Sequence, residues 1–153
     1  MAGVRGVAQT TEISTGTESS EAEKKTLLQL VAAANHRVKV DEISISFKGV
    51  DNTADPVLVR IFRQSSAGTM SALTPKKLNE ADDETLQTTA QEDASVEPTT
   101  GDEIMGEEVH PQSGFLWQAP FGKEIIVKGG NRLAVVVTAA EAVDCKARMS
   151  FEE

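Results

Sequence analysis

The chain has few of the residues that build disulfide frameworks, metal sites and catalytic centres. Its 153 residues include one cysteine, two histidines, five phenylalanines, one tryptophan and no tyrosine. One cysteine excludes an internal disulfide framework. The three His and Cys residues are too few and too far apart in the sequence for a zinc site. The core must therefore consist mainly of Val, Leu, Ile and Ala.

Long apolar runs are also missing. No stretch approaches the roughly 18 to 20 apolar residues that a membrane-spanning helix needs. The first residues, MAGVRG, lack the apolar centre of a secretory signal. We therefore expect a soluble protein that binds no membrane and is synthesised in the cytoplasm.

The sequence contains none of the common catalytic or cofactor motifs. It has no Gly-x-Ser-x-Gly elbow, and neither a Lys-Ser/Thr pair nor a helical pattern follows Gly129 and Gly130, as a phosphate-binding loop would require. The run 82–84 lacks the spacing of a calcium loop. Cys145 lies in an alternating run typical of a buried, inert thiol. We expect no enzyme activity, no cofactor and no metal.

The net charge of −9 is concentrated in one segment. Residues 80–109 contain eleven Asp and Glu and no Lys or Arg, whereas the rest of the chain is close to neutral. This distribution argues against nucleic-acid binding, which needs a basic surface. It indicates either a solvated face or a patch that meets a basic partner. The candidate exposed acidic face consists of Asp82, Asp83, Glu84, Glu107 and Glu108.

The clearest structural signal is a predicted β-hairpin over residues 125–138. Two β-rich runs flank the sequence Gly129-Gly130-Asn131, and Gly and Asn accept the positive φ that tight turns require. The second run, 132–138, is apolar at consecutive positions. This pattern favours a strand covered on both faces, so we expect it at the centre of a sheet.

Apolar alternation predicts further strands and no long helix. A change of parity at Asp41 and Glu42 indicates a β-bulge, 86–95 is polar enough for an edge strand, and 65–84 is expected to be a long ordered loop. Phe115, Trp117 and Phe121 are expected to pack against 125–138; the alternative is that Trp117 stacks on a sugar. The remaining strands are expected at 24–33, 37–50, 57–64, 104–110, 114–118 and 142–152.

These eight or nine strands predict an all-β fold for residues 24–153, an antiparallel β-sandwich, with a jelly roll favoured. Residues 1–23 are expected to form an extended N-terminal arm, because their apolar residues are too isolated to offset the entropy of ordering. The candidate docking residues of the arm are Val4, Val7 and Ile13. A frayed terminus is the alternative.

Several short stretches together carry a resemblance to a known class of proteins. They are DPVLV at 55–59, RQ at 63–64, AGTMSALTP at 67–75, KL at 77–78, EPT at 97–99, HP at 110–111, WQAP at 117–120, GNRLAV at 130–135 and SFEE at 150–153. Over residues 24–153 the chain resembles small structural proteins of tailed phages that decorate, or cement, capsids.

The resemblance implies a non-enzymatic virion protein with a β-sandwich fold on the capsid exterior. It implies the major capsid protein as partner, stabilisation of the assembled shell, and a homotrimer. A receptor- or glycan-binding module of a phage head or tail fibre remains an alternative. A cellular carbohydrate-binding domain ranks lower, because such domains expose several aromatic residues and this chain has few.

Overall fold

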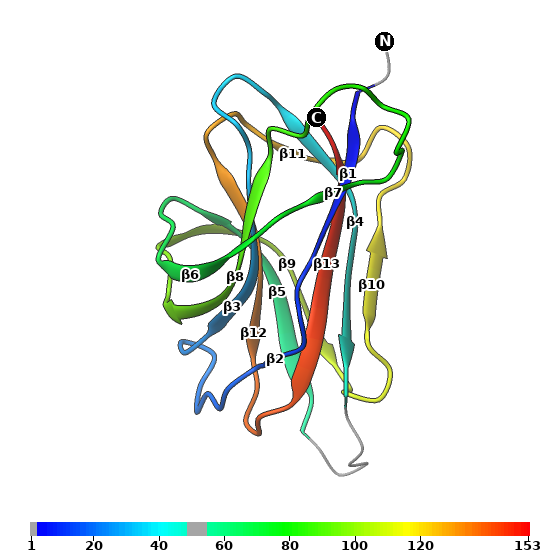
Figure 1. The fold of residues 1–153 in the computed structure, drawn as a ribbon. Helices are drawn as coiled ribbons and strands as arrows, with labels where there is room; N and C mark the ends of the chain where they lie inside the picture. The colour runs from blue at the N-terminus through cyan, green and yellow to red at the C-terminus, as the bar shows by residue number, and fades with distance from the viewer. Residues whose placement is uncertain (1–2, 49–54) are drawn as a thin grey trace.

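The computed structural model of the protein describes residues 3–48 and 55–153, which form two antiparallel β-sheets (Figure 1). Within these ranges every regular element is a β-strand, and the two sheets share one apolar core. The predicted all-β sandwich is therefore confirmed. The jelly-roll connectivity stays a prediction.

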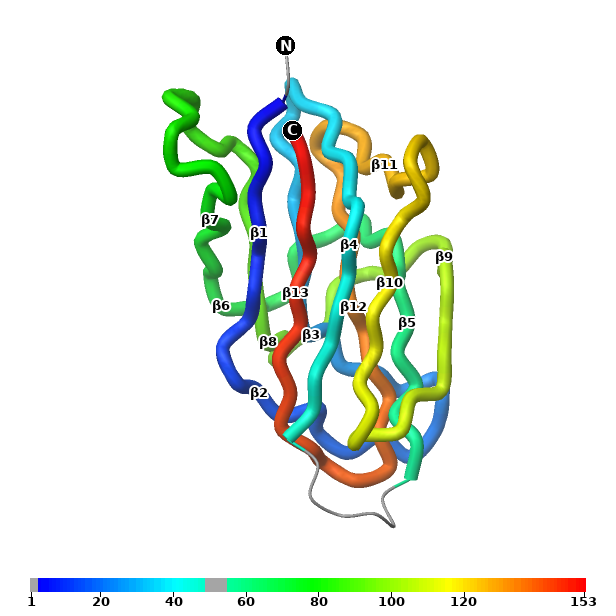
Figure 2. The backbone as a smooth tube through the Cα atoms, turned by 90° about the vertical axis from the view of Figure 1, so that its right-hand side faces the viewer, coloured from blue at the N-terminus to red at the C-terminus, as the bar shows by residue number. Residues whose placement is uncertain are grey.

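The first sheet has the strand order β10-β4-β13-β1-β7, with β11 pairing with β4 and β2 with β13. Figure 2 shows β1, β13, β4 and β10 side by side. The strands of this sheet are β1 (Arg5–Gln9), β2 (Ile13–Ser14), β4 (Val38–Phe47), β7 (Lys76–Lys77), β10 (Phe115–Gln118), β11 (Ile125–Val127) and β13 (Asp144–Glu152).

The second sheet has the order β6-β8-β3-β12-β5-β9. The central position predicted for 132–138 is confirmed, because β12 pairs with both β3 and β5 and its residues 133–137 are all buried. The strands of this sheet are β3 (Lys25–Val31), β5 (Val57–Gln64), β6 (Thr69–Leu73), β8 (Thr89–Val96), β9 (Thr100–Val109) and β12 (Arg132–Thr138).

The core lies between the two sheets and is built by period-two alternation. On β13, Cys145, Ala147, Met149 and Phe151 are buried, while the intervening residues are not. Facing side chains from the second sheet include Leu28, Leu30, Ile61, Leu133 and Val135. Successive residues of a strand point to opposite faces, so on β13 the parity of a residue decides whether its side chain enters the core.

The predicted bulge at Asp41 is confirmed. Glu42 pairs with Ser150 and Val40 with Phe151, so Asp41 is one extra residue in β4. Its carbonyl accepts a hydrogen bond from Ala119 N at 2.9 Å. The extra residue keeps the apolar side chains on both sides of the bulge facing the core.

The predicted hairpin over 125–138 is wrong in its pairing. The turn exists, with Asn131 N donating to Lys128 O at 2.9 Å and Gly130 at φ 82°. However, β11 pairs with β4 in the first sheet, whereas β12 lies in the second. The Gly-Gly-Asn corner therefore crosses between the sheets. A tight turn joins two strands, but only the surrounding strands decide whether those two pair with each other.

The stretch 86–95 was predicted as an edge or outer strand, and its strand β8 lies next to the edge of the second sheet but not at it. β6, which lies in the stretch 65–84 that was expected to be an irregular loop, pairs with β8 and covers it. Nine strands of the structure correspond to predicted ones, and β1, β2, β6 and β7 come in addition among the described residues. β2 and β7 have two residues each, which is too few to show an alternation.

The separate N-terminal arm is corrected as well. β1 pairs with β13 along its whole length, and Val4 and Ile13 are 5% and 9% exposed. Val7, the third predicted docking residue, is half-buried. The small residues decide this docking: Ala8 faces the core, and at Gly6 a Cβ would lie 2.6 Å from the ring of Phe151. These residues therefore belong to the sandwich.

Candidate interaction surfaces

The described residues contain no cluster of three His, Cys, Asp or Glu that could hold a metal ion. His36 lies in the loop between β3 and β4, and the Nδ1 of His110 accepts a hydrogen bond from Gln112 N at 3.1 Å on a different loop. Over residues 3–48 and 55–153, no helix is long and apolar enough to cross a membrane.

Cys145 is buried on β13, and its Sγ donates to Ile13 O at 3.4 Å. Burial, and then the charges of Asp144 and Asp93, raise the pKa of its thiol to about 12. At pH 8 we expect a thiol reagent such as DTNB to react roughly 100-fold or more slowly with the folded protein than with the unfolded chain. Rapid, stoichiometric labelling of the native protein, followed by absorbance, would contradict this burial.

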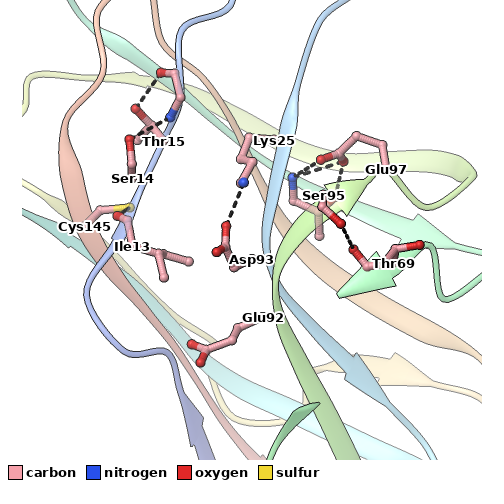
Figure 3. Close-up of polar contacts among 12 residues, drawn as sticks. Ile13, Ser14, Thr15, Lys25, Thr69, Glu92, Asp93, Ser95, Glu97 and Cys145 are labelled. Carbon is pink, nitrogen blue, oxygen red and sulfur yellow. Dashed lines mark hydrogen bonds and ion pairs between the residues drawn. The ribbon is translucent and has the colours of Figure 1, made fainter. Parts of the chain in front are cut away.

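Three acids of the predicted solvated segment 80–109 form internal contacts instead, and Figure 3 shows those of Asp93 and Glu97. Glu92 is 8% exposed and accepts a hydrogen bond from Thr11 N at 2.8 Å. Glu97 accepts from the backbone and the hydroxyl of Thr26, at 2.9 and 2.6 Å. Asp93 pairs with Lys25 at 2.6 Å. These carboxylates tie β8 and the turn after it to the N-terminal part of the chain.

Two further carboxylates accept hydrogen bonds from backbone N–H groups in other parts of the chain. The side chain of Glu153 accepts hydrogen bonds from the backbone N–H groups of Gln87 and Thr88, both at 2.8 Å. Glu18 is 8% exposed and accepts from Ala139 N at 2.8 Å. In each case the carboxylate satisfies a backbone donor that lies outside the strand ladders.

Burial raises the pKa of Glu18 above its ordinary 4.5, and the hydrogen bond from Ala139 and the charge of Lys25 offset this only in part. A raised pKa in the folded state means that protonated Glu18 favours folding below about pH 4.5 and that this contribution is lost as the pH rises. Replacing Glu18 by Gln mimics the protonated form. We expect an equal or higher melting temperature than wild type at pH 7, and a difference that shrinks towards pH 4.5.

The matched control for this variant is Glu141→Gln, which makes the same change of charge at an exposed position. Thermal unfolding followed by circular dichroism at both pH values measures the effect. If Glu18→Gln lowered the melting temperature at pH 7 well below that of the control, the ionised carboxylate would be the stabilising form.

The predicted acidic face is two separate surfaces. Asp83 and Glu84 are exposed in the loop between β7 and β8, with Asp82 half-buried beside them, whereas Glu107 and Glu108 are exposed on β9. β9 is one edge of the second sheet, and the loop follows β7 at an edge of the first. Figure 2 places the two on opposite sides of the molecule. The charge of the segment is therefore divided.

The loop surface, residues 78–85, is named the acidic lobe. Leu78 N donates to Arg5 O at 2.9 Å, which anchors the lobe to β1. The amide of Asn79 donates to the carboxylate of Asp82 at 2.7 Å, and its oxygen accepts from Ala81 N at 3.1 Å. Leu78 itself is 51% exposed. The lobe is therefore an ordered surface that presents acids beside an apolar side chain.

A hollow of about 390 Å³ lies on the other side of the chain ends and is named the basic hollow. The hollow is formed by the loop between β3 and β4 and by the segment from β11 to the turn that follows it. The side chain of Ile126, which is 38% exposed, forms its apolar wall. In Figure 2 the lobe lies to the left of the chain ends and β11 to their right. The residues that line the hollow are Ala34, Asn35, His36, Arg37, Ile126, Lys128 and Gly129.

Comparison with known proteins adds no relative. No family model, curated protein or solved structure matches the chain.

The outer edge of the first sheet, formed by β10 and β11, exposes large apolar side chains. Leu116 is 59% and Phe121 fully exposed. Lys123 N donates to Pro120 O at 2.8 Å, and Gly122 has φ 78°, so Phe121 sits at the tip of a tight turn. The prediction that Phe121 packs inside is wrong, because this turn loops out of the edge. Its signal in the sequence was the Pro-Phe-Gly triplet, which is typical of a turn.

Phe115 and Trp117 pack against the core cluster, so their predicted place in the core is confirmed, but their strand pairs with β4 and not with the segment 125–138. On β10 they alternate with the exposed Leu116 and Gln118. Strand β10 therefore directs two aromatic side chains towards the core and the apolar side chain of Leu116 towards solvent. We name Leu116 and Phe121 together the apolar edge.

Proposed function

We propose that the protein is a non-catalytic virion protein that binds the exterior of an assembled phage capsid and stabilises it by bridging neighbouring subunits. The major capsid protein is its partner, and the bound form is a homotrimer. The resemblance of residues 24–153 to phage decoration proteins supports the choice of partner. The apolar edge is the structural observation that carries the choice of a protein-binding function.

A fully exposed phenylalanine on an ordered turn is costly in water and favours burial against another protein. Phe121 is held in place by the Pro120–Lys123 turn, so little conformational entropy is lost when it is covered. Covering an aromatic side chain of this size contributes about 1.5 to 3 kcal/mol, and aromatic anchors dominate many protein interfaces. Leu116 extends the apolar contact along β10.

The test is co-sedimentation of the purified protein with capsid shells that lack it. We expect wild-type protein to pellet with the shells, and the double variant Leu116→Ser/Phe121→Ala to bind about 10-fold or more weakly. Val96→Ser is the matched control, because Val96 is also 59% exposed but lies on β8. Absence of wild-type binding, or equal weakening by the control, would overturn the proposal.

A glycan- or receptor-binding module of a head or tail fibre is the second candidate. A shallow polar hollow of about 180 Å³ on the outer face of the first sheet favours it, with side chains that can bond to hydroxyl and acidic groups of a sugar. Electron microscopy of virions carrying labelled protein separates the two functions. Label over the shell supports decoration, and label confined to tail tips supports the fibre. The hollow is lined by Gln9, Ser44, Ser46, Lys146, Ala147 and Arg148.

A further inference from the structure

The acidic lobe and the basic hollow beside the chain termini are complementary in charge and both carry an exposed apolar side chain. We infer that the protein self-associates head to tail, with the acidic lobe of one copy bound in the basic hollow of the next. The partner is thus a second copy of this chain. The inference rests on the proposed function only because that function involves several copies of the protein in one assembly. Its test uses the isolated protein.

Charge complementarity is the first argument. The lobe exposes Glu80, Asp83 and Glu84, and the rim of the hollow exposes Arg37 and Lys128. In the part of the chain that the structure describes, none of these five side chains forms an ion pair. The charges are therefore free to meet a partner, and like charges would oppose lobe-to-lobe contact between copies of this acidic protein.

The second argument is that both surfaces carry an exposed apolar side chain. Leu78 is 51% exposed on the lobe, and Ile126 is 38% exposed in the wall of the hollow. Docking would remove both from water while the acids reach the basic rim. An apolar contact surrounded by charged groups is the usual anatomy of a specific protein interface.

Both surfaces are also ordered before they meet. Lys77 Nζ, at the end of β7, donates to the carbonyl of Asp82 in the lobe at 2.5 Å. At the hollow, Gly130 N donates to Ala32 O and His36 N to Ala33 O, both at 3.0 Å. A Cβ at Gly129 would lie 2.5 Å from Ala34 O, so the two loops of the hollow are in close contact. Preformed surfaces lose little entropy on binding.

The arrangement decides the kind of assembly. The lobe and the hollow flank the chain ends (Figure 2), where Glu84 of the lobe and His36 of the hollow line one further pocket. A contact that joins the lobe of one copy to the hollow of the next is heterologous, and such contacts close into a ring when the rotation between copies permits. A ring of this kind is compatible with the trimer proposed above.

The experiment is light scattering with size exclusion on three full-length variants. The hollow variant is Arg37→Glu/Lys128→Glu, the lobe variant is Asp83→Lys/Glu84→Lys, and the control is Glu107→Lys/Glu108→Lys, which makes the lobe variant's change of charge on β9. We expect wild type and control to associate, and each of the other two to have the monomer mass. Melting curves confirm that all variants are folded.

Mixing the hollow and lobe variants is the decisive step. The reversed lobe fits the reversed hollow, and the unchanged lobe of the one fits the unchanged hollow of the other, so the mixture should form mixed dimers or longer alternating assemblies although neither variant associates alone. Strict alternation cannot close a three-membered ring, so a closed trimer is expected of the wild type and not of the mixture. We also expect wild-type association to weaken between about 0.05 and 0.5 M salt, because exposed charges are screened. A mixture that stays monomeric, or a monomeric wild type at high concentration, would overturn the inference.

These experiments distinguish a failure of this inference from a failure of the proposed function. Failure of the decoration proposal would appear as absent shell binding by a wild-type protein that still associates in solution. Failure of the present inference would appear as a wild-type protein that binds shells yet stays monomeric when isolated. If the hollow variant alone lost shell binding and its self-association were unchanged, the hollow would be a shell contact and the inference would fall.

Discussion

Removal of the first two strands is expected to abolish folding. A chain that lacks residues 3–15 loses β1 and β2, which pair with β13 along most of its length. Val4, Ala8 and Ile13 leave the core with them. The backbone of β13 and part of the core would then be exposed to water. We expect no cooperative thermal unfolding transition by circular dichroism.

A pair of point substitutions tests the same strand without deleting it. Ala8 is fully buried opposite Met149, whereas Gln9, the next residue, is exposed. Ala8→Asp places a carboxylate in the core without a partner and should cost several kcal/mol, or about 10 °C in melting temperature. Gln9→Asp should change stability by less than about 0.5 kcal/mol. Equal melting temperatures for the two variants would show that the strand does not belong to the core.

Truncation of Phe151 is expected to have the largest effect of a single core substitution. Phe151 is the largest fully buried side chain among the described residues, and it packs over Gly6 of β1. Phe151→Ala removes its buried surface and leaves a cavity between the sheets, with an expected loss of about 3 to 5 kcal/mol. In a chain of this length that is roughly 10 °C in melting temperature.

The matched control is Phe121→Ala, the same substitution at a fully exposed phenylalanine. It should change the free energy of unfolding by less than about 0.5 kcal/mol, although it should weaken shell binding. Denaturant unfolding of both variants measures the difference. If the two substitutions cost the same free energy of unfolding, the burial of Phe151 or the exposure of Phe121 described above would be incorrect.

The two phenylalanines show how local patterns and tertiary structure share the determination of this fold. Phe151 lies in the alternating run 142–152, and its buried face followed directly from parity. Phe121 lies outside any alternating run, and its exposure depends on a turn that leaves the edge of the first sheet. The residues of a regular strand obey period two, whereas a turn residue has no such constraint.

Pairing was the part of the fold that local patterns did not reveal. The bulge at Asp41 was predictable because one inserted residue changes parity within a single strand. The partners of β11 were not, because β4 is far away in the sequence and competes with the neighbouring β12. The docking of β1 depends on small residues such as Ala8, because only a small side chain fits at that point of the core. Small residues carry almost no hydrophobic signal, so the sequence did not reveal this strand.

The charge of the chain shows the same division. The sequence by itself determined that residues 80–109 are acidic, that no catalytic motif is present, and that the fold is all-β, because composition and period-two alternation are local properties. Only the tertiary structure decided that Glu92 is buried against Thr11, that Glu107 and the lobe face different directions, and that Arg37 and Lys128 meet at one hollow. Those relations depend on how two sheets bring distant segments together, and no local pattern contains that information.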